Sequence, residues 1–220
     1  MRLLDKAYNK NLNFVVALDG PSASGKGHIS SLLAKEFSLI SVSSSAGYRG
    51  MAYICLEKKI DASDTARIID LSKKTDIIAE TKDIDLNDEQ IGAYASKLAI
   101  IPEIRENLSL YLKELIRTTP RIIMEGRDIG TVIAPNADLK IYITASVSVR
   151  AERRYKQLRA GGKDCILSDI LEQLIDRDHR DMNRLVAPLL PAIDACIIDT
   201  TDITPHKVVQ KIKKIISKSL

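Results

Sequence analysis

The sequence predicts an α/β fold in which a parallel sheet is flanked by helices. Short apolar runs rich in β-branched residues alternate along the chain with stretches in which apolar residues recur at helical spacing. Near-continuous apolar runs are typical of strands buried on both faces, and helices between such strands give the βαβ units of a parallel sheet. The four expected strands are residues 14–18, 121–124, 139–143 and 195–198.

Three other stretches show a helical pattern. Apolar residues recur at helical spacing from Ile29 to Phe37 and from Pro102 to Ile116. The third stretch begins with Thr204 as the expected N-cap, and it gathers valines and isoleucines on one face and lysines on the other. A basic amphipathic helix of this kind can bind a membrane or nucleic acid, but we interpret it as a surface helix with a solvated outer face.

Length and composition fit one globular unit. The chain has 220 residues, of which 45% are hydrophobic and 28% charged, and it lacks the run of about 18 apolar residues that predicts a membrane span. The first residues show no apolar signal core, and the three cysteines form neither a CxxC pair nor a disulfide framework, so we expect a cytoplasmic protein. Three histidines without HxxxH spacing predict no zinc site.

A phosphate-binding loop is the clearest local motif. Residues 20–26 read GPSASGK and match the first seven positions of G-x-x-x-x-G-K-[ST], with a buried-type strand before them and an amphipathic helix after them. Glycines allow the backbone to approach phosphate oxygens, successive N–H groups form an anion nest, and the helix adds its positive end. Lys26 would reach the β- and γ-phosphates. The alternative is a strand–helix turn with a surface lysine.

The motif is incomplete after the lysine. Gly27 and His28 follow Lys26, so no hydroxyl stands directly after the lysine to ligate magnesium. We interpret His28 as an exposed residue of the first helical turn, with a phosphate contact as the alternative.

The arginines are unevenly distributed. Nine of the 14 lie between Arg121 and Arg184, and arginine is preferred over lysine where bidentate contact with phosphate is needed. One cluster shares a helix face just before Gly161 and Gly162, a plausible lid hinge, and a second stripe turns from apolar to charged as a helix entering a cleft would. An ion-paired surface helix is the alternative for that stripe. The cluster is Arg150, Arg153 and Arg154, and the stripe is Ile170, Leu174, Arg177, Asp181 and Arg184.

A third feature is the segment 124–131, MEGRDIGT, directly after an expected strand. Ligands bind at the carboxyl ends of strands in open α/β sheets, so this loop is a candidate binding segment. Glu125 ends the strand and could hold magnesium through water, with a capping or ion-paired carboxylate as the alternative.

Together these motifs resemble the bacterial-type cytidylate kinases, which are nucleoside monophosphate kinases. The matching segments follow one another over most of the chain, and EGRDIGT and RDxRDxNR are the most specific parts. His28 departs from the resemblance, because similar loops carry threonine there. The segments are ALDGPSASGKG (17–27), SSSAGYRGMA (43–52), ASKLAIIPEIR (95–105), EGRDIGTVIAPNADLKIYITAS (125–146), VRAERRYKQL (149–158) and RDHRDMNRLVAPLLPAIDACIIDTT (177–201).

The resemblance implies a P-loop kinase that transfers a phosphoryl group from ATP, bound with Mg²⁺, to CMP or dCMP. It implies catalytic roles for Lys26, Arg127 and Arg154. The implied ATP-binding residues are Gly20, Pro21, Ser22, Ala23, Ser24, Gly25, Lys26, Gly27, His28 and Arg153. The implied CMP-binding residues are Arg49 and Arg127 for the phosphate, Ser44, Ser96, Arg105, Asp128 and Arg184 around cytosine, and Arg177 and Asp181 near the pentose.

We expect a single kinase unit over 1–220, acting as a monomer. Its core would be 12–60 and 118–220, with a short CMP-binding insertion at about 61–117 and a lid at about 154–168. Within the insertion, the charged stretch 73–89 is expected to be exposed.

Three alternatives remain open. One is a P-loop kinase for UMP or AMP, and another is a nucleotide-binding protein with impaired catalysis, suggested by His28. The third is a nucleic-acid binder, suggested by an isoelectric point of about 8.9. Against this third alternative, the basic residues are not interleaved with the aromatic residues that single-strand binders usually use (no Trp, 2 Phe).

Overall fold

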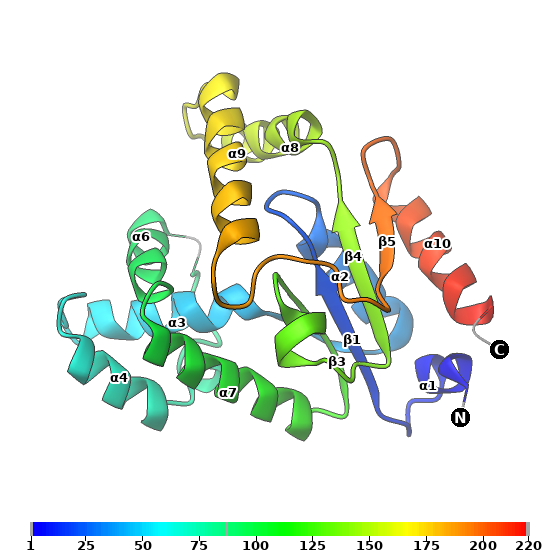
Figure 1. Cartoon of the computed structure of the whole chain (residues 1–220), viewed down its shortest axis with the longest axis horizontal. Helices are drawn as coiled ribbons and strands as arrows, with labels where there is room; N and C mark the ends of the chain where they lie inside the picture. Colours follow the sequence, from blue (N-terminus) through cyan, green and yellow to red (C-terminus); the bar gives the residue numbers. More distant parts are fainter. Residues whose placement is uncertain (1, 87, 219–220) are drawn as a thin grey trace. The chain divides into compact units, whose positions relative to one another are not determined.

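The computed structural model of the chain describes residues 2–86 and 88–218. These residues form two compact units (Figure 1). One consists of the residues up to Ser41 together with those from Thr119 onward, and the other is Val42–Thr118. The second unit contains the whole of the expected insertion, 61–117, and begins earlier than that insertion.

The first unit is built on a parallel sheet, which confirms the predicted fold class. Its strands lie in the order β2-β3-β1-β4-β5. The central strand β1 pairs in parallel with β3 and β4, and β4 pairs in parallel with β5. The strands are β1 (Phe14–Asp19), β2 (Ile40–Ser43), β3 (Arg121–Gly126), β4 (Leu139–Thr144) and β5 (Cys196–Asp199).

The sequence prediction missed β2. Its sequence, ISVS, alternates apolar and hydroxyl residues, and none of the four is fully buried. A strand at the edge of a sheet does not need a continuous apolar run, which is why this one gave no signal.

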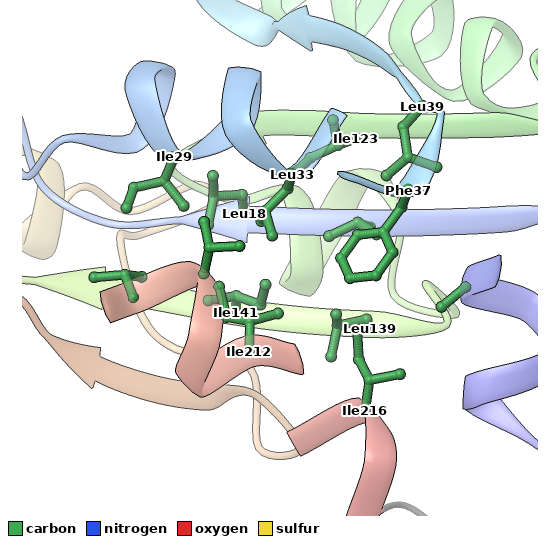
Figure 2. Packing of buried hydrophobic residues seen from close by; sticks show 14 of the residues in the cluster. Leu18, Ile29, Leu33, Phe37, Leu39, Ile123, Leu139, Ile141, Ile212 and Ile216 are labelled. Atoms are coloured by element: carbon green, nitrogen blue, oxygen red, sulfur yellow. The ribbon is translucent and has the colours of Figure 1, made fainter. Parts of the chain in front are cut away.

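Helices α2 (Lys26–Phe37) and α10 (Pro205–Lys218) pack on the sheet of the first unit. Figure 2 shows Leu33 and Phe37 of α2 turned towards the strands, where Leu18 and Ile141 lie, with Ile212 of α10 in the same cluster. The apolar face of α10 is buried while most of its lysines are exposed, as the predicted amphipathic pattern requires. A short helix, α1 (Leu3–Tyr8), adds further apolar side chains to this core.

Three further helical segments of the first unit follow β3 and β4. The π-helix η1 (Ile129–Ile133) follows β3 after the two residues Arg127 and Asp128. Helix α8 (Val147–Ala160) follows β4, with the Ser146 hydroxyl accepting from Val149 N as its cap, and it packs through a small apolar cluster on α9 (Leu167–Asn183). Figure 1 shows α8 and α9 beyond the carboxyl ends of β1 and β4.

The second unit is helical and has its own apolar core. The described side chains of its charged stretch 73–89 are mostly exposed, but the prediction was wrong in one part, because the stretch contains a short helix with Ile77 fully buried. Gly50 permits that burial, since a Cβ built on Gly50 would lie 2.5 Å from Ile77 Cγ2. The helices are α3 (Ser44–Glu57), α4 (Thr65–Lys74), α5 (Ile77–Glu80), α6 (Glu89–Leu98) and α7 (Pro102–Thr118).

Candidate active site

The loop between β1 and α2 has a shape that its two glycines make possible. A Cβ built on Gly20 would lie 2.0 Å from the carbonyl oxygen of Ile143 in β4, so no side chain fits there. Gly25 is the N-cap of α2 and has a φ of 95°, in the region that side chains disfavour. The spacing of glycines in the motif therefore follows from a close backbone approach at one end and a left-handed residue at the other.

Lys26 is the first residue of α2 and is almost completely buried, with an exposed fraction of 5%. Its Nζ donates to the carbonyl oxygen of Pro21 at 2.7 Å, so the side chain folds back across the loop. Burial, and then the nearby charge of Arg127, hold the pKa of Lys26 well below its usual range, while Glu125 and Asp19 oppose this. A bound phosphate would supply the negative charge that the buried ammonium group lacks.

Glu125 faces the first turn of α2. A Cβ built on Gly27 would lie 4.0 Å from Glu125 Oε1. The carboxylate therefore lies close to where the hydroxyl of a complete G-x-x-x-x-G-K-[ST] motif would project. Among the residues that the structure describes, no group of three or more His, Cys, Asp or Glu side chains forms a ready metal cluster. One carboxylate beside a phosphate loop fits Mg²⁺, which keeps several waters and usually binds through one or two carboxylates plus substrate phosphates.

The loop after β3 meets the end of α9 through charged pairs. Arg127 Nε lies 3.1 Å from Asp181 Oδ2, and Arg177 Nε lies 3.9 Å from the same oxygen. Arg184 Nη2 lies 3.5 Å from Asp128 Oδ2. All five of these residues were predicted from the sequence to be CMP-binding residues, and the structure brings them together within the first unit.

The three arginines of α8 have different surroundings. Arg150 is buried and donates to the carbonyl oxygens of Ala145 and Ser22, at 2.9 and 3.2 Å, and to Asp178 at 2.6 Å. Arg150 therefore ties α8 and α9 to the phosphate loop.

Arg153 and Arg154 lie on the same helix. Arg153 donates to the Thr200 carbonyl at 2.6 Å and approaches the Ser24 carbonyl at 3.5 Å. Arg154 is exposed and donates to Gln157 at 2.9 Å. Their roles in ATP binding and catalysis stay predictions.

Other predicted residues of the phosphate loop and its helix differ in burial. Ser24 is buried and His28 is exposed, as the sequence interpretation of His28 expects. Ala23 has a φ of 58°.

Four predicted residues lie in the second unit. Arg49 of α3 donates to the carbonyl oxygens of Leu86 at 2.5 Å and Asp88 at 3.4 Å. Ser96 donates to Gly92 O at 3.0 Å, and a Cβ built on Gly92 would lie 3.0 Å from Arg49 Nη2, so both side chains lie against the same stretch of α6. The other two lie at helix ends. Ser44 is the first residue of α3, and Arg105 Nη1 lies 3.4 Å from the carbonyl oxygen of Ala99, the C-cap of α6.

The sequence prediction missed one residue of this region, Asp19. It is the last residue of β1 and is 3% exposed. Its carboxylate accepts hydrogen bonds from the backbone N–H groups of Ile129 and Gly130. Burial raises its pKa to about 6, against the lowering effect of the two N–H groups. The only available signal was an acidic residue ending an apolar strand directly before Gly20.

Comparison with known proteins shows the family of the chain. A family model described as cytidylate kinase matches residues 16–218. The chain belongs to the cytidylate kinase family. Similar curated relatives, all named cytidylate kinase, come from Rickettsia bellii (57% identical over 216 residues, 98% of each chain), Rickettsia canadensis (55% over 212 residues, 96% of each chain) and Rickettsia rickettsii (53% over 218 residues, 99% of this chain and 98% of the relative).

Solved structures confirm the fold of this cytidylate kinase family member at low sequence identity. Shikimate kinase from Bacteroides thetaiotaomicron has a TM-score of 0.53 at 10% identity, covering 93% of this chain and 98% of that one. A gluconokinase from Sinorhizobium meliloti has a TM-score of 0.52 at 12% identity, covering 94% and 93%. Within the described part of the chain, no helix has the length and apolar character needed to cross a membrane.

Proposed function

We propose that the protein transfers the terminal phosphoryl group of ATP to CMP and dCMP, giving CDP and dCDP. Family membership supports the reaction. In the structure, the observation that best supports this reaction is the parallel register of β1 and β3. Asp19, directly before the phosphate loop, pairs with Gly126, directly before Arg127. The donor loop and the acceptor loop therefore leave the sheet side by side.

The donor side of the reaction rests on the loop of residues 20–28. Its backbone N–H groups and the amino end of α2 attract phosphate oxygens. Lys26 would leave the carbonyl of Pro21, to which it donates now, and bind the β- and γ-phosphates. Arg153 would bind ATP, and Arg154 would neutralise charge on the transferring group.

Mg²⁺ bound with ATP supplies neutralisation of the β- and γ-phosphate charge. Glu125 would hold it through water, because its carboxylate faces the first turn of α2 where the loop has no hydroxyl.

The acceptor side rests on the arginines and carboxylates of the first unit. The CMP phosphate has a second pKa of about 6, so it is mostly dianionic at neutral pH and can attack without a general base. Arg127 would bind that phosphate, with its guanidinium oriented by Asp181. Arg177 and Asp181 would lie near the pentose.

Selection of the base falls to Asp128 and Arg184. Asp128 would accept from the exocyclic amine of cytosine, which uracil replaces with a carbonyl. Arg184, which lies beside Asp128, would hold the carboxylate in place and contact the ring. The resemblance adds Arg49 for the phosphate and Ser44, Ser96 and Arg105 around the base; these four roles stay predictions.

The setting we propose is that of a cytoplasmic monomer whose partners are small nucleotides. The free thiols of Cys55, Cys165 and Cys196 fit a reducing compartment. We interpret the net charge of +4 as suited to small phosphorylated substrates rather than to a nucleic-acid polymer.

The experiment that tests the function is a coupled assay of ADP formation with purified protein, ATP and Mg²⁺. CMP and dCMP are expected to be the preferred acceptors, with UMP and AMP poorer by about tenfold or more. A preference for UMP or AMP would overturn the choice of substrate. ATP binding without CDP formation at millimolar CMP would favour a nucleotide-binding protein with impaired catalysis.

A further inference from the structure

Asp19 occupies the junction between the two substrate loops. In the sheet it pairs with Gly126 of β3 on one side and with Tyr142 of β4 on the other. The phosphate loop begins at the next residue, Gly20. The side chain of Asp19 nevertheless does not turn to that loop. Its Oδ1 accepts from Ile129 N at 2.8 Å and its Oδ2 accepts from Gly130 N at 2.7 Å.

These two N–H groups belong to the first turn of η1. The first N–H groups of a helical segment have no partner within it and are usually satisfied by a capping side chain at the preceding residue. Asp128 stands in that position, and its side chain makes no capping hydrogen bond. Asp19 therefore caps η1 from another strand, and the carboxylate of Asp128 faces Arg184 instead.

The contact is tight as well as polar. A Cβ built on Gly130 would lie 3.2 Å from Asp19 Oδ2, closer than side chains normally approach. The position of the η1 backbone is thus fixed relative to β1 by two hydrogen bonds and by close packing. Because Arg127 and Asp128 lie between β3 and η1, both ends of that short link are anchored.

Keeping a carboxylate in this place is costly for the folded protein. Burial disfavours its charged form and raises its pKa to about 6, and the charge of Asp128 adds to this. An amide side chain would avoid this cost, but its NH₂ group would oppose one of the two N–H groups that now face Oδ1 and Oδ2. The unfavourable burial of this carboxylate has a functional reason if the reaction depends on the backbone position of the residues after Asp128.

We propose that Asp19 is a positioning residue for base selection: by accepting from the amides of Ile129 and Gly130, it holds Asp128 where it distinguishes cytosine from uracil. This inference rests on the proposed function. It assigns Asp19 no contact with either substrate. The effect passes through the backbone of η1 to the carboxylate that reads the base.

The test is Asp19→Asn with CMP and UMP as competing acceptors. The amide keeps the size of the side chain but offers one acceptor oxygen, and its NH₂ group opposes one of the two N–H groups. We expect the ratio of kcat/KM for CMP to that for UMP to fall by about tenfold. Asp19 also lies near Lys26, so kcat will change too, but a loss shared by both acceptors cancels in the ratio.

A matched control is Asp138, which directly precedes β4 and contacts the amino end of β1. Asp138 is partly buried, and its Oδ2 accepts from Val15 N at 2.9 Å. Asp138→Asn therefore also removes a carboxylate that accepts from a backbone N–H group of the sheet, but at the opposite end of β1 from Asp19. It should lower stability and leave the CMP to UMP ratio unchanged within about twofold.

A second variant keeps the inference testable if Asp19→Asn does not fold. Gly130→Ala places a methyl group against Asp19 Oδ2 and should shift the same turn by a few tenths of an ångström, lowering the ratio by about threefold.

Each result has one meaning. A wild-type protein selective for CMP, with an unchanged ratio in the folded Asp19 or Gly130 variant, would overturn this inference alone. An equal fall in Asp138→Asn would overturn it as well, because the effect would then be a general loss of order. A wild-type protein that does not phosphorylate CMP would overturn the proposed function itself.

Discussion

The two ends of the sheet in the first unit carry the same kinds of side chain, but these side chains have different partners. Each end has a carboxylate that accepts from backbone N–H groups: Asp138 at the amino end of β1 and Asp19 at its carboxyl end. Each end also has an arginine from β3 or the residue after it. At the amino end this is Arg121, and at the carboxyl end it is Arg127.

The two arginines differ in what they bind. Arg121 donates to main-chain carbonyl oxygens from α1, from the end of α2 and from the segment before β1, and its guanidinium lies over the ring of Phe14 at 5.7 Å. Arg127 pairs with the carboxylate of Asp181 and approaches the Gly126 carbonyl at 3.3 Å. The carbonyl acceptors of Arg121 are Lys6, Ala7, Asn9, Leu12, Phe37 and Ser38.

This difference distinguishes an arginine with a structural role from Arg127, which we propose binds the acceptor phosphate. The acceptors of Arg121 are main-chain carbonyl groups of the protein itself, so Arg121 links the three segments throughout the folded state. A cation near the end of a helix also stabilises that helix. A carboxylate partner orients a guanidinium while leaving it able to meet a phosphate. The amino end should therefore control stability, and the carboxyl end should control turnover and substrate choice.

Lys26→Met is expected to have the largest effect, and to act on turnover alone. Methionine keeps the length and burial of the side chain but removes the charge that we propose binds the β- and γ-phosphates. We expect kcat to fall by about a thousandfold. The free energy of unfolding should not fall, because burial disfavours the charged lysine in the folded state. Steady-state kinetics and urea unfolding of the same sample measure both, and near-normal turnover would contradict the role of the loop.

Arg121→Ala should show the opposite behaviour at the amino end. It leaves several partly buried carbonyls of α1, α2 and the segment before β1 without their donor, and we expect the free energy of unfolding to fall by about 3 kcal/mol. KM values for ATP and CMP should stay within about twofold of the wild type. Urea unfolding and kinetics test this.

Arg121→Lys provides the graded control for that change. The ammonium group keeps the charge but not the planar array of donors, so an intermediate loss of stability is expected. If either Arg121 variant raised the KM for CMP as strongly as it lowered stability, the separation between the two ends would be wrong.

Asp128→Ala should change substrate choice more than stability. If this carboxylate accepts from the cytosine amine as proposed, its removal should lower the preference for CMP over UMP by about tenfold to a hundredfold, in line with about 1–3 kcal/mol for a base-reading contact. Competition between the two acceptors in one reaction gives the ratio directly. Unchanged selectivity would move base recognition to other residues.

Patterns local in sequence predicted most of this unit. The buried strands, the helices on their faces and the glycine-lysine loop follow from apolar periodicity and from the conformations that Gly20 and Gly25 allow. The clustering of Arg127, Asp128, Arg177, Asp181 and Arg184 followed from the family motifs, and the α9 stripe placed its members on one helix face.

The parts that were not predicted depend on contacts between distant segments. Asp19 and its partner Ile129 are 110 positions apart, and nothing local to either residue indicates the pairing. Arg150 shares a helix face with Arg153 and Arg154, and periodicity alone did not show that Arg150 is buried against the phosphate loop. Ile77 is one apolar residue in a charged stretch, and its burial depends on the space at Gly50.

The smallest effect concerns the pH dependence of stability at the carboxyl end. Burial raises the pKa of Asp19 from 3.8 to about 6, so the folded protein binds this proton more tightly than the unfolded chain does. The stabilising contribution of the proton is therefore present at low pH and is lost as the pH rises through about 6. Between about pH 5 and pH 7 the wild type should lose about 1 kcal/mol of stability relative to Asp19→Asn, which has no group to titrate there. Urea unfolding of both proteins at the two pH values measures this difference; a difference of the opposite sign would mean that hydrogen bonds from η1, rather than burial, dominate the Asp19 carboxylate.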